Sequence, residues 1–129
     1  MRSLEPNISA VQMIAPAVWT GNNTAAATDL PGFESACLAI HTGAIVGSGD
    51  FSIELQESDS TAGGTFATVA PEHLTGTLPS TLEADSTYRL GYIGHRRYVR
   101  TVLTRNSGTS IALGAVLIKG HPHDAPVAA

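Results

Sequence analysis

The segment Phe51–Ser58, FSIELQES, decides the fold class because its side chains alternate between apolar and polar. Phe51, Ile53 and Leu55 fall on one face of an extended chain, and polar side chains fall on the other. The pattern predicts a β-strand that covers a core with one face only. A turn-forming run, SDSTAGGT, follows and leads into TFATVA, so residues 51–70 are predicted to form an antiparallel hairpin.

Other strands are predicted on both sides of this hairpin. Residues 33–43, FESACLAIHTG, carry apolar side chains at period two. Residues 109–120, TSIALGAVLIKG, are almost continuously apolar, which predicts a central strand buried on both faces. TYRLGYIG (87–94) and RRYVRTVLTR (96–105) are predicted to be two strands separated by a turn.

The composition indicates one all-β domain. The chain has 129 residues, of which 43% are hydrophobic, enough for a single compact core. Only 14% of residues are charged and 13 are glycine, unlike the composition of a helical bundle. We therefore expect a single antiparallel β-sandwich of about seven or eight strands. Residues 1–7 and 120–129 are predicted to be extended arms.

Charge and hydropathy exclude several classes of protein. The net charge of -4 argues against a nucleic-acid binder, whose domain is usually basic. No apolar run is long enough to span a membrane, and the N-terminus lacks the apolar core of a signal peptide. The single cysteine, Cys37, excludes an intramolecular disulfide and fits a reducing cytoplasm. We expect it to be a small buried residue, with a reactive thiol as the alternative.

No catalytic or metal-binding pattern stands out. The chain has no nucleophile elbow, no zinc-protease motif and no phosphate-binding glycine loop. Glu54 and Glu57 fall on opposite faces of their strand, so they cannot share a proton. His121 and His123 are close enough to share an ion, but a site needs three or four rigidly held ligands. We expect no enzyme activity, no cofactor and no metal.

Positive charge is concentrated in one stretch. Residues 88–105 carry five of the seven basic residues, and no basic residue lies between Arg2 and Arg89. Ten of the eleven acidic residues lie before this stretch. Arginine is favoured over lysine where carboxylates are held bidentately, which predicts an interface. The candidate interface residues are Arg89, Arg96, Arg97, Arg100, Arg105 and Tyr98. The alternative is a set of solvated strand residues whose stems cover tyrosine rings.

Three segments carry a family resemblance. IELQESDSTAGGTFATVAPEHLTG, YRLGYIGHRRYVRTVLT and GAVLIKGHPHDAPVA resemble small structural proteins from the head-gene region of tailed bacteriophages and prophages. Those proteins look like capsid decoration, or cement, proteins. The resemblance starts at ISAVQMIAPAV and covers most of the chain. It implies a β-sandwich or jelly-roll-like domain that binds the outside of an assembled capsid, and it carries over no catalytic residue.

The expected function follows from this resemblance and from the absence of catalytic motifs. We expect a virion protein, made in the host bacterial cytoplasm, that decorates and stabilises a tailed-phage capsid by non-covalent binding between capsomers. Its partners would be the major capsid protein and further copies of itself, most simply as a trimer. A head–tail connector or tail structural protein is the first alternative. A carbohydrate-binding module is the second, but it would need exposed aromatic residues, and Trp19 is the only tryptophan.

Overall fold

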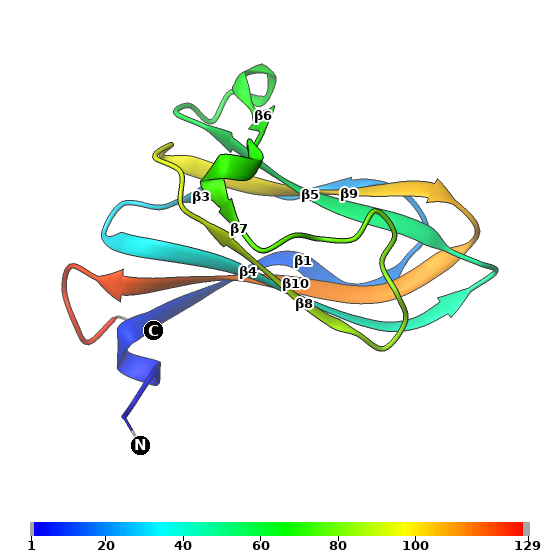
Figure 1. Cartoon of the computed structure of the whole chain (residues 1–129), viewed down its shortest axis with the longest axis horizontal. Helices are drawn as coiled ribbons and strands as arrows, with labels where there is room; N and C mark the ends of the chain where they lie inside the picture. Colours follow the sequence, from blue (N-terminus) through cyan, green and yellow to red (C-terminus); the bar gives the residue numbers. More distant parts are fainter. Residues whose placement is uncertain (1, 128–129) are drawn as a thin grey trace.

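In the computed structural model, which describes residues 2–127, two antiparallel sheets stack face to face (Figure 1). Sheet A contains, in spatial order, β1 (Ile8–Trp19), β10 (Ser110–Pro122), β4 (Phe33–Val46), β8 (Thr87–Tyr92) and β7 (Leu74–Thr75). Sheet B contains β2 (Asn23–Thr24), β9 (Tyr98–Ser107), β5 (Asp50–Ser58) and β6 (Ala67–Thr68), with β3 (Thr28–Asp29) also paired to β9. Short 3-10 turns lie between strands: η1 (Glu5–Asn7), η2 (Gly63–Thr65) and η3 (Pro71–His73).

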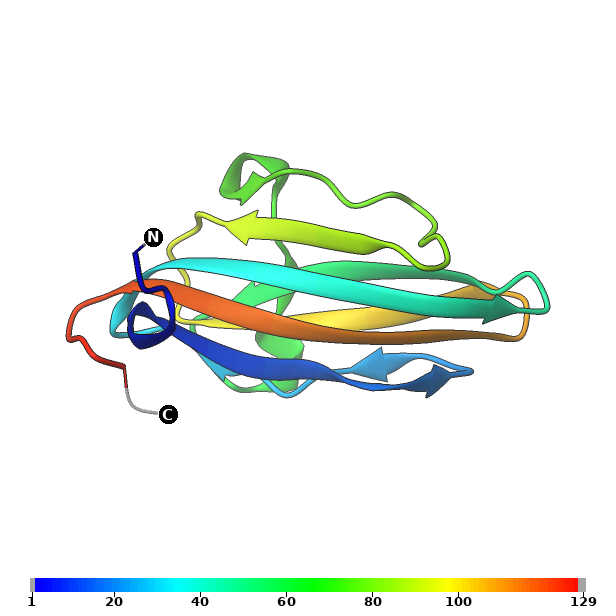
Figure 2. The ribbon, with the colours of Figure 1, turned by 90° about the horizontal axis from the view of Figure 1, so that it is seen from below.

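The strand order is that of a jelly roll. Apart from the two-residue β7, sheet A reads β1-β10-β4-β8 and sheet B reads β2-β9-β5-β6, so the chain wraps around the sandwich as two Greek keys. Figure 2 looks onto sheet A and shows β8, β4, β10 and β1 side by side in that order. The predicted all-β antiparallel sandwich is confirmed, and the observed strand order agrees with the β-sandwich or jelly-roll-like domain that the resemblance implies.

β5 forms where the alternating segment predicts it. Phe51, Ile53 and Leu55 are buried between the sheets, and β5 pairs with β6 as the predicted hairpin requires. Apolar side chains from both sheets form one core around them, among them the fully buried Leu38, Ile40, Val99, Leu103, Ile111 and Leu117. The alternation of FSIELQES therefore reports a strand with one face in the core and one face outside.

The prediction that residues 109–120 are buried on both faces is wrong. β10 alternates instead: Ile111, Leu113 and Leu117 point into the core, whereas Val116 points outward and is 38% exposed. The reason is that the outer side of the middle of sheet A carries no covering layer among the described residues (Figure 2). The apolar residues of β10 thus contribute to two surfaces, the core and the outside of the sheet.

The two strands predicted within residues 87–105 exist but do not pair with each other. β8 belongs to sheet A and β9 to sheet B, so residues 93–97 carry the chain from one sheet to the other; we call this segment the crossover. The Ile93 N–H donates to the His73 carbonyl at 2.8 Å, and the Leu30 N–H donates to the Arg97 carbonyl at 2.9 Å. Backbone hydrogen bonds therefore hold both ends of the crossover.

Cys37 does not lie in the core, contrary to expectation. Its neighbours Ala36 and Leu38 point inward and are buried, so Cys37 points outward from β4 and is half-buried. The alternation that identifies β4 as a strand also fixes this outward position.

The arms are shorter than predicted. Residues 5–7 of the predicted N-terminal arm form η1, and residues 120–122 of the predicted C-terminal arm extend β10 alongside β4. Residues 1 and 128–129 lie outside the described part of the chain. Residues 123–127 fold back, and the Val127 N–H donates to the Pro6 carbonyl at 2.8 Å. Ladder pairing and this contact hold segments that the sequence alone leaves free.

Candidate functional site

The predicted arginine cluster is distributed over the molecule. Arg96 and Arg97 lie in the crossover, and Arg100 points outward from β9 on sheet B. Arg105 lies at the far end of β9, and Arg89 points outward from β8 on sheet A. Arg100 is the next outward-pointing residue after Tyr98, and Arg96, Arg97 and Tyr98 are consecutive and lie together.

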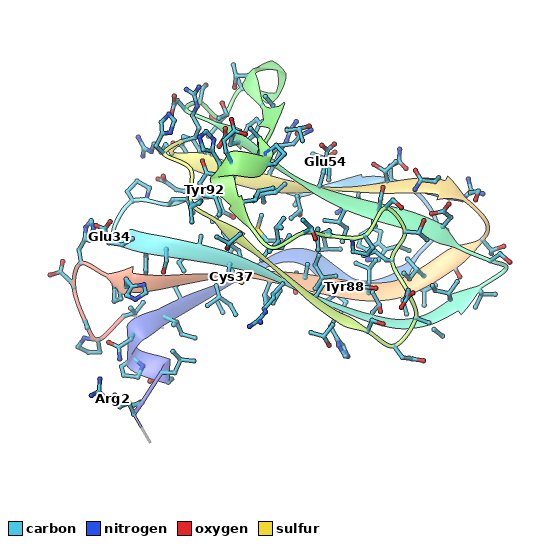
Figure 3. The ribbon with its side chains drawn as sticks, viewed as in Figure 1. Arg2, Glu34, Cys37, Glu54, Tyr88 and Tyr92 are labelled. Atoms are coloured by element: carbon cyan, nitrogen blue, oxygen red, sulfur yellow. The ribbon has the colours of Figure 1, made fainter. Side chains whose placement is uncertain are left out.

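These three residues lie at one end of the sandwich, which we call the crossover end. It brings together the crossover, the β3–β4 turn (residues 30–32), the start of β4 and the segments leading to both termini, on the left in Figure 1. Figure 3 shows Tyr92 and Glu34 at this end. A hollow of about 550 Å³ opens between the crossover and the β3–β4 turn. We take this end as the candidate functional site.

Arg97 forms a bidentate pair with Asp29 of β3. Its Nε lies 3.0 Å from Oδ1 and its Nη2 lies 2.9 Å from Oδ2, the fork geometry that arginine offers to a carboxylate. The Arg97 guanidinium holds the pKa of Asp29 below its usual value. The guanidinium carbon also lies 5.0 Å from the ring centre of Tyr98. Arg97 therefore has two intramolecular partners that fix its direction.

Arg96 pairs with Asp59 in the turn after β5. The Arg96 Nη1 donates to Asp59 Oδ2 at 2.5 Å, and the Arg97 backbone N–H donates to Oδ1 at 3.3 Å. The hydrogen bond from Arg96 lowers the pKa of Asp59. Both side chains are well exposed, so the pair contributes more to geometry than to stability. Asp59 therefore ties the crossover to sheet B at two consecutive residues.

Tyr92, at the end of β8, supports the crossover from below. Its hydroxyl donates to Glu57 Oε2 at 2.5 Å and accepts from the Arg96 backbone N–H at 3.1 Å. Burial, followed by the hydrogen bond to Glu57, raises the pKa of Tyr92. His73 Nδ1 lies 3.9 Å from Glu57 Oε1, and the His73 ring meets the His95 ring edge-on at 5.6 Å. A polar layer thus lies directly under an exposed loop.

Gly94 lets the crossover fold tightly over Tyr92. A Cβ atom at Gly94 would lie 2.5 Å from the Tyr92 ring, a distance at which the ring or the loop must move. The tight path leaves the preceding side chain, Ile93, pointing away from the protein with 61% of its surface exposed. The crossover therefore presents one large apolar side chain beside two arginine–aspartate pairs.

The histidines considered as metal ligands have separate partners. His121 Nδ1 lies 2.8 Å from the Ser35 hydroxyl, whereas His123 Nε2 contacts the Glu34 carboxylate. The His123 N–H also donates to the Gly32 carbonyl at 2.8 Å. Across residues 2–127, no group of three or more histidine, cysteine, aspartate or glutamate side chains is placed to hold a metal ion. These contacts fasten the C-terminal segment to the crossover end.

The remaining predicted interface residues lie elsewhere. Arg100 donates from Nε to Gln56 Oε1 at 2.8 Å, and its guanidinium covers the Phe66 ring at 4.2 Å. Arg105 donates to the Gly108 carbonyl in the turn before β10. Arg100 follows Tyr98 on the outward face of β9, whereas Arg105 lies near the other end of that strand. Their interface role stays a prediction.

A second surface feature is the outer side of sheet A, which we call the A face. Its residues are the outward-pointing side chains of four adjacent strands, and their alternation follows from the ladder register. They are Ile8, Ala10, Gln12, Pro16 and Val18 of β1; Ala112, Gly114, Val116, Ile118 and Gly120 of β10; Ser35, Cys37, Ala39 and His41 of β4; and Thr87, Arg89 and Gly91 of β8. Counting histidine as neutral, Arg89 is the only charged residue of this set.

The outer side of sheet B differs sharply. Glu54, labelled on the upper side in Figure 3, accepts from the Thr68 hydroxyl at 2.5 Å and lies near Gln56. Gln56 in turn accepts from Arg100. Polar groups there are paired with one another, whereas the A face is apolar and made mostly of small side chains.

Sequence reasoning missed both Ile93 and the A face. Ile93 sits inside the arginine-rich stretch, but its exposure depends on Gly94 and on the crossover leaving its sheet. The A face could have been found from the small residues at every second position of β4 and β10. The prediction that residues 109–120 are buried on both faces left no reason to interpret these small residues as an exposed surface.

The fold and the site define a class: a jelly-roll β-sandwich with a hydrogen-bonded polar end and one apolar outer face. No protein-family model matches the chain, and no curated protein matches its sequence. The described residues contain no helix with the length and apolar character needed to cross a membrane.

Two solved structures are similar. The SPBc2 prophage-derived protein YomS aligns over 92% of this chain and 98% of its own, with 13% identity and a TM-score of 0.52. A structure of infectious bursal disease virus, Gx strain, aligns over 92% of this chain and 33% of its own, with 9% identity and a TM-score of 0.49. At this identity the likeness to YomS establishes a shared fold.

Proposed function

We propose that this chain is a virion structural protein that decorates the outside of a tailed-phage capsid and stabilises it by binding between capsomers. The observation that carries the proposal is the crossover end, where Ile93 is 61% exposed and lines the same hollow as the ion-paired Arg96 and Arg97. Binding interfaces draw most of their energy from a few central anchors surrounded by polar groups. Side chains held before contact lose little entropy on binding.

Two further observations support a viral structural role. A prophage-derived protein shares the fold along nearly its whole length. The segments leading to both termini are fastened to the same end as Ile93, so the whole end can contact a neighbouring surface as one unit. The expected partner is the major capsid protein, and the role needs no catalytic residue.

The carbohydrate-binding alternative loses its key residue. Trp19 is half-buried and packs against the core, and its Nε1 donates to the Ala15 carbonyl at 3.0 Å. A sugar-binding platform needs an aromatic ring that faces solvent. The connector and tail alternatives differ from decoration in copy number, which makes them outcomes of the same experiment.

Decoration acts by mass action. A protein that binds only the assembled shell stabilises it by about 2.7 kcal/mol per site when free protein is a hundredfold above Kd. The experiment mixes the purified protein with heads that lack it, pellets the particles, and measures bound copies and the temperature of DNA release. We expect saturation at hundreds of copies and a higher release temperature.

Two matched variants locate the contact. Ile93→Asp places a charge at the centre of the proposed contact and should weaken binding at least about thirtyfold, the loss typical of an interface anchor. Val46→Asp makes the same kind of change at a side chain that is 56% exposed at the opposite end, and it should bind as the wild type does. Saturation at about a dozen copies would indicate a connector or tail role. Saturation without heat resistance would rule out a cement mechanism.

A further inference from the structure

We propose that two copies of this chain pair through their A faces, with the two-fold axis running along the strands between β10 and β4. The face is apolar, open and gently hollowed: one depression of about 320 Å³ lies beside Val116 and a second of about 420 Å³ lies beside Ile118. Val18 and Val116 on this face are 65% and 38% exposed. An apolar sheet face of this kind is unusual on a monomer.

The face is large enough for a stable pair. Four strands about 4.8 Å apart, with about nine residues of each at about 3.4 Å per residue, give roughly 19 Å by 30 Å, or about 570 Å² per copy. Two copies would bury about 1,100 Å², which reaches the roughly 1,000 Å² that a specific interface requires. Alanine and glycine at the middle positions allow the two sheets to approach closely, as sheets do inside a sandwich.

Charge placement selects a second copy and one orientation. Gln12, Val116, Ala39 and Arg89 stand in one row across the four strands, so Gln12 and Arg89 lie at opposite edges of the face. A two-fold axis along the strands sets Arg89 of each copy against Gln12 of the other, where the amide oxygen can accept from the guanidinium. The two arginines then lie on opposite edges and do not repel. In this orientation no two like charges of the A faces lie opposite each other.

Edge-to-edge pairing of sheets is a weaker route to a pair. β1 is the free edge of sheet A, but its ladder is irregular between Gln12 and Ile14 and again between Ile14 and Ala17. Pro16 in the second irregular stretch lacks a backbone N–H. Bulges and proline are the features that keep edge strands from adding further strands.

The orientation of the pair also bears on capsid binding, and this step rests on the proposed function. Rotation about an axis along the strands leaves the strand direction unchanged, so both crossover ends point the same way. Two Ile93 anchors would then meet one capsid surface, and the second contact would become intramolecular. A two-fold axis perpendicular to the strands would instead point the two crossover ends in opposite directions.

The first test is sedimentation of the full chain over a range of concentrations. We expect a reversible dimer. Val116→Lys places a charge in the middle of the A face and should weaken the dimer at least a hundredfold. Val102→Lys is the matched control, because Val102 points outward from β9 opposite Glu54 and the new lysine gains a partner there. Far-ultraviolet circular dichroism should show that both variants are folded.

The second test addresses the orientation. Within one copy, Gln12 and Arg89 are three strand spacings, about 14 Å, apart, too far to interact in 0.15 M salt. Gln12→Lys should therefore weaken the dimer about fivefold or more, by facing Arg89 of the second copy. Adding Arg89→Glu to Gln12→Lys should restore wild-type affinity.

The outcomes separate this inference from the proposed function. A wild-type monomer, a trimer, or a dimer that withstands Val116→Lys would overturn pairing through the A face, whatever happens at the capsid. A dimer that Gln12→Lys leaves unchanged would overturn the orientation. If the dimer forms as described and heads still fail to bind it, the pairing stands and the proposed function fails. If both hold, Val116→Lys should bind heads at least tenfold more weakly than the wild type.

Discussion

Tyr92→Phe tests the polar layer that supports the crossover. The change removes one oxygen atom from a side chain that is 5% exposed. That oxygen donates to the Glu57 carboxylate at 2.5 Å and accepts from the Arg96 N–H at 3.1 Å. A hydrogen bond to a charged group contributes about 1.5–3 kcal/mol. The Glu57 carboxylate and the Arg96 N–H would each also lose a hydrogen-bond partner. We expect the free energy of unfolding to fall by about 2 kcal/mol.

Thermal and urea unfolding measure this loss. For a domain of this size, a change of about 2 kcal/mol lowers Tm by roughly 8 °C. Tyr88→Phe is the matched control, because its hydroxyl accepts one hydrogen bond, from the Glu83 N–H at 2.9 Å, at a half-buried position. That variant should lose no more than about 1 kcal/mol. Equal losses in the two variants, or no loss in Tyr92→Phe, would refute the role assigned to Tyr92.

The raised pKa of Tyr92 predicts that the stability of the fold depends on pH, and Tyr92→Phe tests this dependence. The pKa of Tyr92 is raised above its usual 10.0, chiefly by burial, so above pH 10 the unfolded chain releases this proton while the folded chain keeps it. The folded state then binds more protons, and stability falls as the pH rises above 10. Tyr92→Phe should lack this component. The wild type should therefore exceed Tyr92→Phe in Tm by less above pH 10 than at pH 9.

Three further predictions concern the core and the crossover end. Ile53→Asp, which buries an unpaired charge, should abolish folding, whereas Glu54→Lys on the outer side should cost no more than about 1 kcal/mol; equal Tm shifts would contradict the register of β5. Gly94→Ala should lower Tm and weaken head binding together, since the tyrosine ring beneath it must move; a variant with unchanged Tm would show that the loop has room. Asp29 has a lowered pKa, so the stability from its pair with Arg97 is present above pH 3.8 and lost as the pH falls through its folded pKa. Asp29→Asn should flatten the acid limb of a Tm-against-pH curve, and an unchanged limb would contradict that pairing.

Local patterns predicted the sheets but not the path between them. The alternation in β5 fixed which side chains enter the core, because a strand has only two faces. Nothing local distinguishes a hairpin from a crossover in residues 93–97, since the same glycine and polar residues suit both. Whether β8 pairs with β9 depends on the other strands that compete for each edge.

The site was predictable only in part. The arginine-rich stretch indicated paired carboxylates, and the structure pairs Arg96 and Arg97 with carboxylates within the chain. Their partners Asp59 and Asp29 stand 37 and 68 residues away in the chain. Such pairs follow from the sheet topology and cannot be read from composition. The A face was missed because an apolar run has two explanations. It fits a strand buried on both faces, and it fits equally well a strand that has one buried face and one exposed apolar face.

The pairing of the first long strand with the last has a consequence for how the chain folds. β1 lies against β10, and β10 separates β1 from every other strand of sheet A. Until residues 110–122 have left the ribosome, β1 has no neighbour and β4 lacks one of its two. Sheet A therefore cannot form before β10 is synthesised, and contacts this distant in sequence place folding in the slow range of milliseconds to seconds. A nascent chain halted before β10 would leave β1 unpaired and one edge of β4 open, which makes such fragments prone to aggregation and targets for chaperones.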